Sequence, residues 1–207
     1  IGNQSKNFSV GANLAMILME AEDDNTFELD AVVNAFQQGT LRMKYSKKPV
    51  VAAPYNMTLG GGAEVCLAAS HIQASAETYM GLVEVGVGVI PGGGGNKELY
   101  MKQLKGLPKG VNIDLQNIVN QTFETIATAK VSTSAEEARD LNFLNFVDGV
   151  SVNPDHLLYD AKQAVIGLVA EGYKPPVREK VPVVGETGYA ALLLGAEGLK
   201  NSGYASD

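Results

Sequence analysis

The apolar positions of this chain follow two patterns, helical periodicity and short continuous runs, and the two alternate along the sequence. Apolar residues recur at helical spacing from Phe27 to Phe36, which predicts an amphipathic helix over 26–45 that Lys47-Lys48-Pro49 ends. The continuous apolar run 50–53 predicts a short buried strand of the parallel type. A second strand is expected over 71–75, and a third is expected to begin at 78–80.

The remaining segments continue the alternation of helices with short strands. Ser134-Ala135-Glu136-Glu137 has the pattern of a capping box and predicts the start of a helix. The other expected elements are a loop at 8–14 turning into a helix over 12–19, helices over 63–69, 97–104, 114–129, 154–170 and 189–199, a strand over 145–150, a polar loop at 105–110 and a stiff connector at 174–178. Short buried strands between helices predict an α/β fold.

Composition narrows the choice of partners. The 207 residues are 45% apolar, which is enough for one sizeable domain with a core. A net charge of −7 and a pI near 4.9 argue against nucleic acid or an anionic membrane surface as the main partner. No apolar run reaches the length of a membrane span, so membrane insertion is not expected. The single cysteine, Cys66, excludes an internal disulfide and suits a reducing compartment, and the two histidines lack the spacing of a metal site.

Two glutamates in glycine-rich surroundings are the candidates for chemistry. Glu64 follows Gly60-Gly61-Gly62-Ala63, and Glu84 lies between Gly81 and Gly86, ahead of Pro91 and four further glycines. Burial of a carboxyl group in an apolar stretch raises its pKa towards neutrality, which suits a pair that handles protons. The alternative is a pair of solvated glutamates at the ends of elements. The surrounding glycines favour the functional interpretation.

The glycines also indicate a site for negative charge. Three glycines ahead of a helix leave unpaired backbone N–H groups at its start, and Gly61 has no Cβ to block a ligand carbonyl. The loop Ser9-Val10-Gly11-Ala12 offers a second N–H donor, and two such donors would form an oxyanion hole for an enolate or a tetrahedral intermediate. Close packing of helix on sheet is the alternative reason for such glycines. Neither a P-loop, a Rossmann fingerprint nor a Gly-x-Ser-x-Gly elbow is present.

Four motifs in this order and spacing resemble the crotonase family of enoyl-CoA hydratases and isomerases. They are Phe8-Ser9-Val10-Gly11-Ala12-Asn13-Leu14, Lys48-Pro49-Val50-Val51-Ala52-Ala53, Leu59-Gly60-Gly61-Gly62-Ala63-Glu64, and Gly81-Leu82-Val83-Glu84 with Gly88-Val89-Ile90-Pro91-Gly92. The resemblance implies the ClpP/crotonase spiral of ββα units, here expected to lack its N-terminal strands. The core would cover 1–130 and the C-terminal helical region 131–207. The chain is also similar to the crotonase-like part of bacterial multifunctional 3-hydroxyacyl-CoA dehydrogenases of fatty-acid oxidation.

The resemblance implies a role for each matched residue. The catalytic glutamates fall on Glu64 and Glu84, and the oxyanion-hole amides fall on Ala12 and Gly61. Gly92 matches a glycine whose N–H helps to hold the reacting water. Val10, Gly11 and Ala12 match the loop that binds the substrate beside the CoA adenine. The implied reaction is the addition of water to a trans-2-enoyl-CoA to give a 3-hydroxyacyl-CoA.

Two other functions stay open. Isomerases of the family commonly keep only the glutamate at the position of Glu84, so the presence of Glu64 favours a hydratase. A non-catalytic acyl-CoA-binding or assembly module is the third possibility. Small departures from the family pattern, Asn13 for Asp and Asn96-Lys97 for Thr-Gln, do not touch the proposed chemistry.

The resemblance also implies the surroundings of the chain. The substrate would be a coenzyme A thioester, with no cofactor in this part and NAD bound only by the dehydrogenase part of the parent polypeptide. The absence of a starting Met and the unmarked C-terminus lead us to expect a piece of a longer chain. The expected location is the cytoplasm. The expected partners are further copies in a trimer-type homo-oligomer or the rest of the parent polypeptide.

Overall fold

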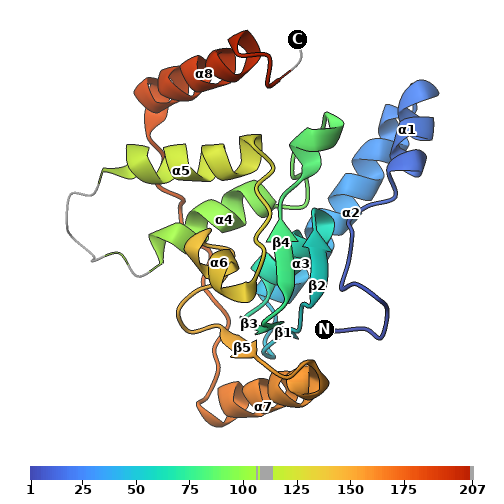
Figure 1. Ribbon diagram of the computed structural model, residues 1–207, viewed down its shortest axis with the longest axis vertical. Helices are drawn as coiled ribbons and strands as arrows, with labels where there is room; N and C mark the ends of the chain where they lie inside the picture. Colours follow the sequence, from blue (N-terminus) through green and yellow to red (C-terminus); the bar gives the residue numbers. More distant parts are fainter. Residues whose placement is uncertain (106, 108–113, 206–207) are drawn as a thin grey trace.

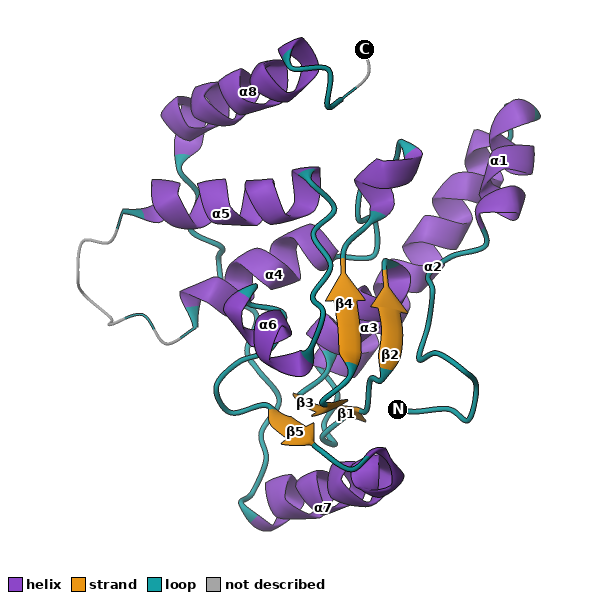
Figure 2. Ribbon diagram, viewed as in Figure 1, coloured by secondary structure: helices purple, strands orange, loops and turns teal. Residues whose placement is uncertain are grey.

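Two small parallel sheets form the centre of the computed structural model, which describes residues 1–105, 107 and 114–205 (Figures 1 and 2). The first sheet has the order β1 (Val51–Ala52), β3 (His71–Ser75) and β5 (Gly149–Ser151). The second pairs β2 (Asn56–Leu59) with β4 (Thr78–Gly81). Every pair of neighbouring strands is parallel, which confirms the α/β class predicted from the sequence.

Helices cover both sheets. α7 packs on β1 and β3, α3 lies between α2 and α4, and α4, α5 and α8 pack one on the next (Figure 2). The helices are α1 (Leu14–Glu22), α2 (Thr26–Lys44), α3 (Gly61–Ala68), α4 (Gly95–Leu104), α5 (Leu115–Ala127), α6 (Ala135–Asp140), α7 (Leu157–Ala170) and α8 (Gly185–Asn201), with 3₁₀ turns at η1 (Glu84–Val87) and η2 (Pro154–His156).

The register of the second sheet brings three loops to one edge. Thr58 lies opposite Met80, and on its other side Thr58 forms a parallel bridge with Ser9. Because all three segments run in the same direction, their continuations leave the sheet at the same end. Gly60 makes the turn into α3 at φ +54°, a conformation that favours glycine, and its N–H donates to the carbonyl of Gly81 at 2.9 Å.

The main core lies between α3, the strands and α6. Its fully buried side chains include those of Ile72, Met80, Leu82 and Phe143, and a smaller cluster under α7 contains Val51 and Leu157. Cys66 is completely buried, and burial raises the pKa of its thiol to about 12. A thiol with so high a pKa is a packing group, not a nucleophile.

Two expectations from the sequence were wrong in detail. No strand was expected at 56–59, yet β2 forms there, because it pairs with β4 on one side and with Ser9 on the other. The strand expected over 145–150 starts only at Gly149, since the residues before it wrap around the carboxylate of Asp148. The predicted loop at 105–110 lies largely outside the described residues. The division of the chain at residue 130 stays a prediction.

The capping box at the start of α6 is confirmed with one change. The Ser134 hydroxyl accepts a hydrogen bond from the N–H of Glu137 at 3.1 Å, as the motif predicts. The Glu137 carboxylate accepts instead from the N–H of Thr133 at 2.7 Å, one residue ahead of the cap.

A buried ion pair anchors α4 to the loop that precedes β5. Lys102 donates to the Asp148 carboxylate at 3.0 Å and to the carbonyl of Phe143 at 2.7 Å. Asp148 also accepts from the N–H groups of Ile72 and Asn145. Burial opposes ionisation of Asp148, but Lys102 and the two N–H donors outweigh it and hold the pKa of this carboxyl below its usual range. Burial lowers the pKa of Lys102, and Asp148 opposes that shift.

We expect Lys102→Met to destabilise the fold by about 3–5 kcal/mol, because Asp148 would keep a buried charge without its cation. Urea unfolding at pH 7 measures the difference. Lys48→Met is the control, since Lys48 is exposed. Equal unfolding free energies for Lys102→Met and the unchanged protein would show that the ion pair contributes no stability.

Candidate active site

Glu64 is the buried carboxylate of the site. It lies in the first turn of α3 and is only 4% exposed. Its Oε1 accepts a hydrogen bond of 2.8 Å from the N–H of Gly95, the residue that begins α4. Burial raises the pKa of Glu64 above its ordinary value, and hydrogen bonds from the Gly95 and Gly93 backbone only partly offset this shift. The N-terminus of α4 therefore orients this carboxylate without abolishing its affinity for a proton.

Glu84 is the second carboxylate, and it begins η1 where the chain leaves β4. A Cβ on Gly60 would lie 3.2 Å from its Oε1, so the carboxylate packs against the turn into α3. Among the described residues, its Oε2 is the one buried side-chain oxygen without a hydrogen-bond partner. Burial raises the pKa of Glu84 to about 7, and the charge of Glu64 adds to the shift. Of the two glutamates predicted as a pair, Glu64 thus influences the protonation of Glu84.

The two predicted amide donors lie on neighbouring loops. Gly11 has φ +95°, and a Cβ on it would lie 3.7 Å from the backbone nitrogen of Gly61. Ala12 comes next in the chain and is exposed. Gly61 opens α3, so its N–H belongs to the first turn, whose N–H groups find no partner inside the helix. The structure therefore brings the loop carrying Ala12 against the start of α3, as an oxyanion hole requires.

Gly92 lies in the turn ahead of α4, whereas Val10 lies on the exposed loop ahead of α1. The carbonyl of Gly92 accepts a 2.7 Å hydrogen bond from the Gln37 side chain, while the next carbonyl, of Gly93, accepts one of 3.0 Å from Thr40. Gly92 thus belongs to the turn that positions Glu64, and α2 holds that turn. Val10 is 62% exposed, beside Gly11, where a bound ligand could cover it.

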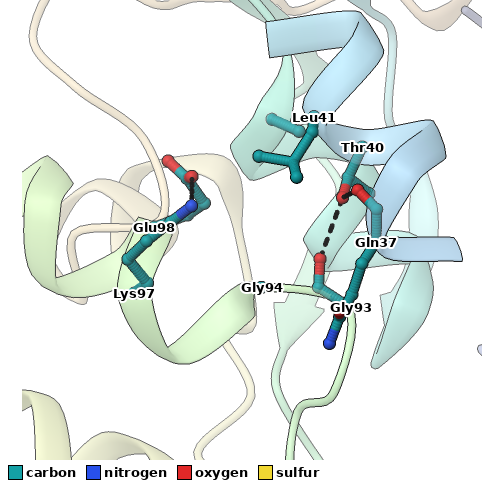
Figure 3. Close-up of a pocket in the computed structure, with 8 residues that line it drawn as sticks. Gln37, Thr40, Leu41, Gly93, Gly94, Lys97 and Glu98 are labelled. Carbon is teal, nitrogen blue, oxygen red and sulfur yellow. Dashed lines mark hydrogen bonds and ion pairs between the residues drawn. The ribbon is translucent and has the colours of Figure 1, made fainter. Parts of the chain in front are cut away.

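Gln37 and Thr40 are site residues that the sequence analysis missed. Figure 3 shows both side chains reaching from α2 towards the glycine turn ahead of α4. In the sequence they are only two polar residues three positions apart, beside the apolar face of the helix. Such a pair by itself does not identify a site. The cavity in this view, about 210 Å³, is lined by Gln37, Thr40, Leu41, Ala68, Gly93, Gly94, Lys97 and Glu98.

The catalytic candidates do not line that cavity. A second cavity of about 820 Å³ lies at the start of β2 and β4, between Asn3–Ser5, Tyr55 and Leu158. Neither cavity contains Glu64 or Glu84 in its wall. The site is therefore defined by the contacts of the two carboxylates and the glycine backbone.

Neither a membrane span nor a metal site is found among the residues that the structure describes. No helix in this part of the chain is long and apolar enough to cross a membrane. Within the same residues, no three His, Cys, Asp or Glu side chains are grouped so that they could hold a metal ion.

Known proteins resemble this chain in sequence and in fold. A Bacillus subtilis protein named "Probable 3-hydroxyacyl-CoA dehydrogenase" is 63% identical over all 207 residues, which make up 26% of its length. The crystal structure of an enoyl-CoA hydratase from Bacillus anthracis has a TM-score of 0.62 at 25% identity, covering 82% of this chain and 57% of that one. A Thermobifida fusca protein solved in complex with CoA has a TM-score of 0.64 at 21% identity, covering 97% and 67%. No family model matches the sequence.

The parallel sheets, the glycine turn into α3 and the solved structures define the class as a crotonase-like α/β fold. The chain is similar in fold to crotonase-family enoyl-CoA hydratases, and in sequence to part of proteins named 3-hydroxyacyl-CoA dehydrogenase and fatty acid oxidation complex trifunctional enzyme. It spans about a quarter of the length of its Bacillus subtilis relative.

We expect Glu84→Gln to be more stable than the unchanged protein at pH 8, with the difference shrinking towards pH 5. Folding raises the pKa of Glu84 from its ordinary value to about 7. The stability that protonated Glu84 contributes is therefore lost as the pH rises through 7. Urea unfolding across this pH range measures the effect, with exposed Glu77→Gln as control. Identical pH dependence in Glu84→Gln and the unchanged protein would contradict the raised pKa.

Proposed function

We propose that this chain is the enoyl-CoA hydratase module of a multifunctional 3-hydroxyacyl-CoA dehydrogenase in fatty-acid β-oxidation. The observation that carries the proposal is the pair Glu64 and Glu84, two carboxyl groups beside the turn into α3 whose pKa values are raised by burial. A carboxyl with a pKa of about 7 can either hold or release a proton at neutral pH. This is the property that the addition of water to an activated double bond needs.

The geometry suggests how the reaction would run. The thioester oxygen of the substrate would accept hydrogen bonds from the N–H groups of Ala12 and Gly61, which stabilise it as it becomes enolate-like. A water molecule would lie between the carboxylates, with the N–H of Gly92 helping to hold it. One glutamate would accept a proton from this water as its oxygen bonds to C3. The other would give a proton to C2, and exchange with solvent would restore the starting pair.

The rest of the proposal concerns ligand and partners. The coenzyme A part of the substrate would lie along Val10, Gly11 and Ala12, and the CoA complex of the similar Thermobifida fusca fold supports such a ligand. Exposed apolar side chains on α1 and α2, among them Met19 and Phe27, favour burial against another copy or against the rest of the polypeptide. The 3-hydroxyacyl-CoA product would pass to the NAD-dependent dehydrogenase part. We place the protein in the cytoplasm.

Hydration of crotonyl-CoA, followed by the loss of enoyl-thioester absorbance, tests this function. We expect Glu64→Gln and Glu84→Gln each to lower kcat by about 10²–10⁴-fold, because each removes a group that transfers a proton. Glu77→Gln should keep full activity, since Glu77 is exposed and outside the site.

Activity that survives Glu64→Gln would show that the role given to Glu64 is wrong. Conversion of a 3-enoyl-CoA in place of crotonyl-CoA hydration would identify an isomerase. Binding of the substrate without turnover of either compound would identify an acyl-CoA-binding module.

A further inference from the structure

Phe36 of α2 lies against two parts of the site, the start of α3 and the glycine turn ahead of α4. A Cβ on Gly61 would lie 3.4 Å from its Cζ, so its ring packs against the start of α3. A Cβ on Gly93 would overlap Cε1 of the same ring, and would come within 2.5 Å of Oε2 of Glu64. Ring edge and carboxylate oxygen therefore border the same point in space. Only glycine at position 93 leaves room for both.

The exposure of Phe36 distinguishes it from an ordinary packing residue. Thr40 is the one buried side chain of α2, whereas Phe36 keeps 36% of its surface exposed. An aromatic ring that only joined two helices would gain most from full burial. Phe36 instead has one edge against two glycines and keeps part of its ring exposed.

We propose that Phe36 is a positioning residue for Glu64, whose ring forms the apolar wall that shields this carboxyl group from bulk water. The proposal deepens the proposed function, because Glu64 is one of its two proton-transferring groups. The ring also fills the space between Gly61 and Gly93, and so fixes the distance between the amide of the oxyanion hole and the turn that holds Glu64.

Besides the ring, few charged groups on the neighbouring elements could influence the pKa of Glu64. α3 carries no other charged side chain, and η1 contributes Glu84. On α2 and α4, Lys44 and Lys97 are both paired with Glu98. The Gly93 and Gly95 backbone supplies the remaining polar contacts. Desolvation is the largest influence on the Glu64 pKa, and the ring is an apolar group in contact with the surroundings of that carboxyl.

The test is a ¹³C NMR titration of the protein labelled at the glutamate carboxyl carbons, with the Glu64 signal assigned by its absence in Glu64→Gln. We expect Phe36→Ala to lower the Glu64 pKa by about one unit, because water would enter where the ring stood. Phe36→Leu keeps much of the apolar bulk and should lower it less. Phe27→Ala, on the same helix but 79% exposed, should leave it unchanged.

Kinetics supply the second readout. We expect kcat/KM for crotonyl-CoA to fall about tenfold in Phe36→Ala, which corresponds to about 1.4 kcal/mol. The limb of the pH profile that Glu64 controls should move to lower pH, and Phe36→Leu should recover most of the activity. A merely structural role would change the activity without moving that limb.

An unmoved Glu64 titration in folded Phe36→Ala, checked by circular dichroism, would overturn the proposal. Should Phe36→Ala not fold, an unmoved titration in Phe36→Leu would overturn it equally. A titration that moves as expected in a protein without hydratase activity would support the role of Phe36 while rejecting the proposed function. The two hypotheses can therefore fail separately.

Discussion

The parallel register of Ser9, Thr58 and Met80 is the constraint on which the rest of the site depends. These residues lie side by side in three segments that run in the same direction. Their continuations become the Gly11 loop, the Gly60 turn and the start of η1, all at one edge. A slip of one residue would turn the side chains of a strand to the opposite face and separate the loops. Strand pairing therefore determines where the loops of the site lie, and the side chains depend on that placement.

The cost of burying a carboxylate is offset by hydrogen bonds at Glu64 but not at Oε2 of Glu84. Glu64 receives hydrogen bonds from the backbone at the start of α4, so its negative charge is partly stabilised. The Oε2 of Glu84 is buried without a partner, and its pKa of about 7 lies within the physiological range. The same carboxyl that makes the site responsive to pH also costs stability when it ionises. Such a cost at a reactive group is common in enzymes.

The sequence predicted what local patterns can encode. Helical spacing gave the amphipathic helix that becomes α2, and the glycine frames gave Glu64, Glu84 and Gly61. β2 was not predicted because Asn56–Leu59 is short and buries Thr58 while Met57 is exposed, so its conformation depends on partners distant in the chain. The contact of Phe36 with Gly93 could not be predicted either. Periodicity places Phe36 on the apolar face of its helix but does not show which residues that face contacts.

α4 links the stability of the fold to the chemistry of the site. Gly95, Leu99 and Lys102 are spaced four and three residues apart, so they lie along one face of the helix. At the start of this face Gly95 donates to Glu64, in the middle Leu99 is fully buried, and at the end Lys102 pairs with Asp148. The buried ion pair therefore fixes the helix whose first N–H orients Glu64. A loss of the pair that let α4 shift would alter the position of Glu64 without changing any residue that touches it.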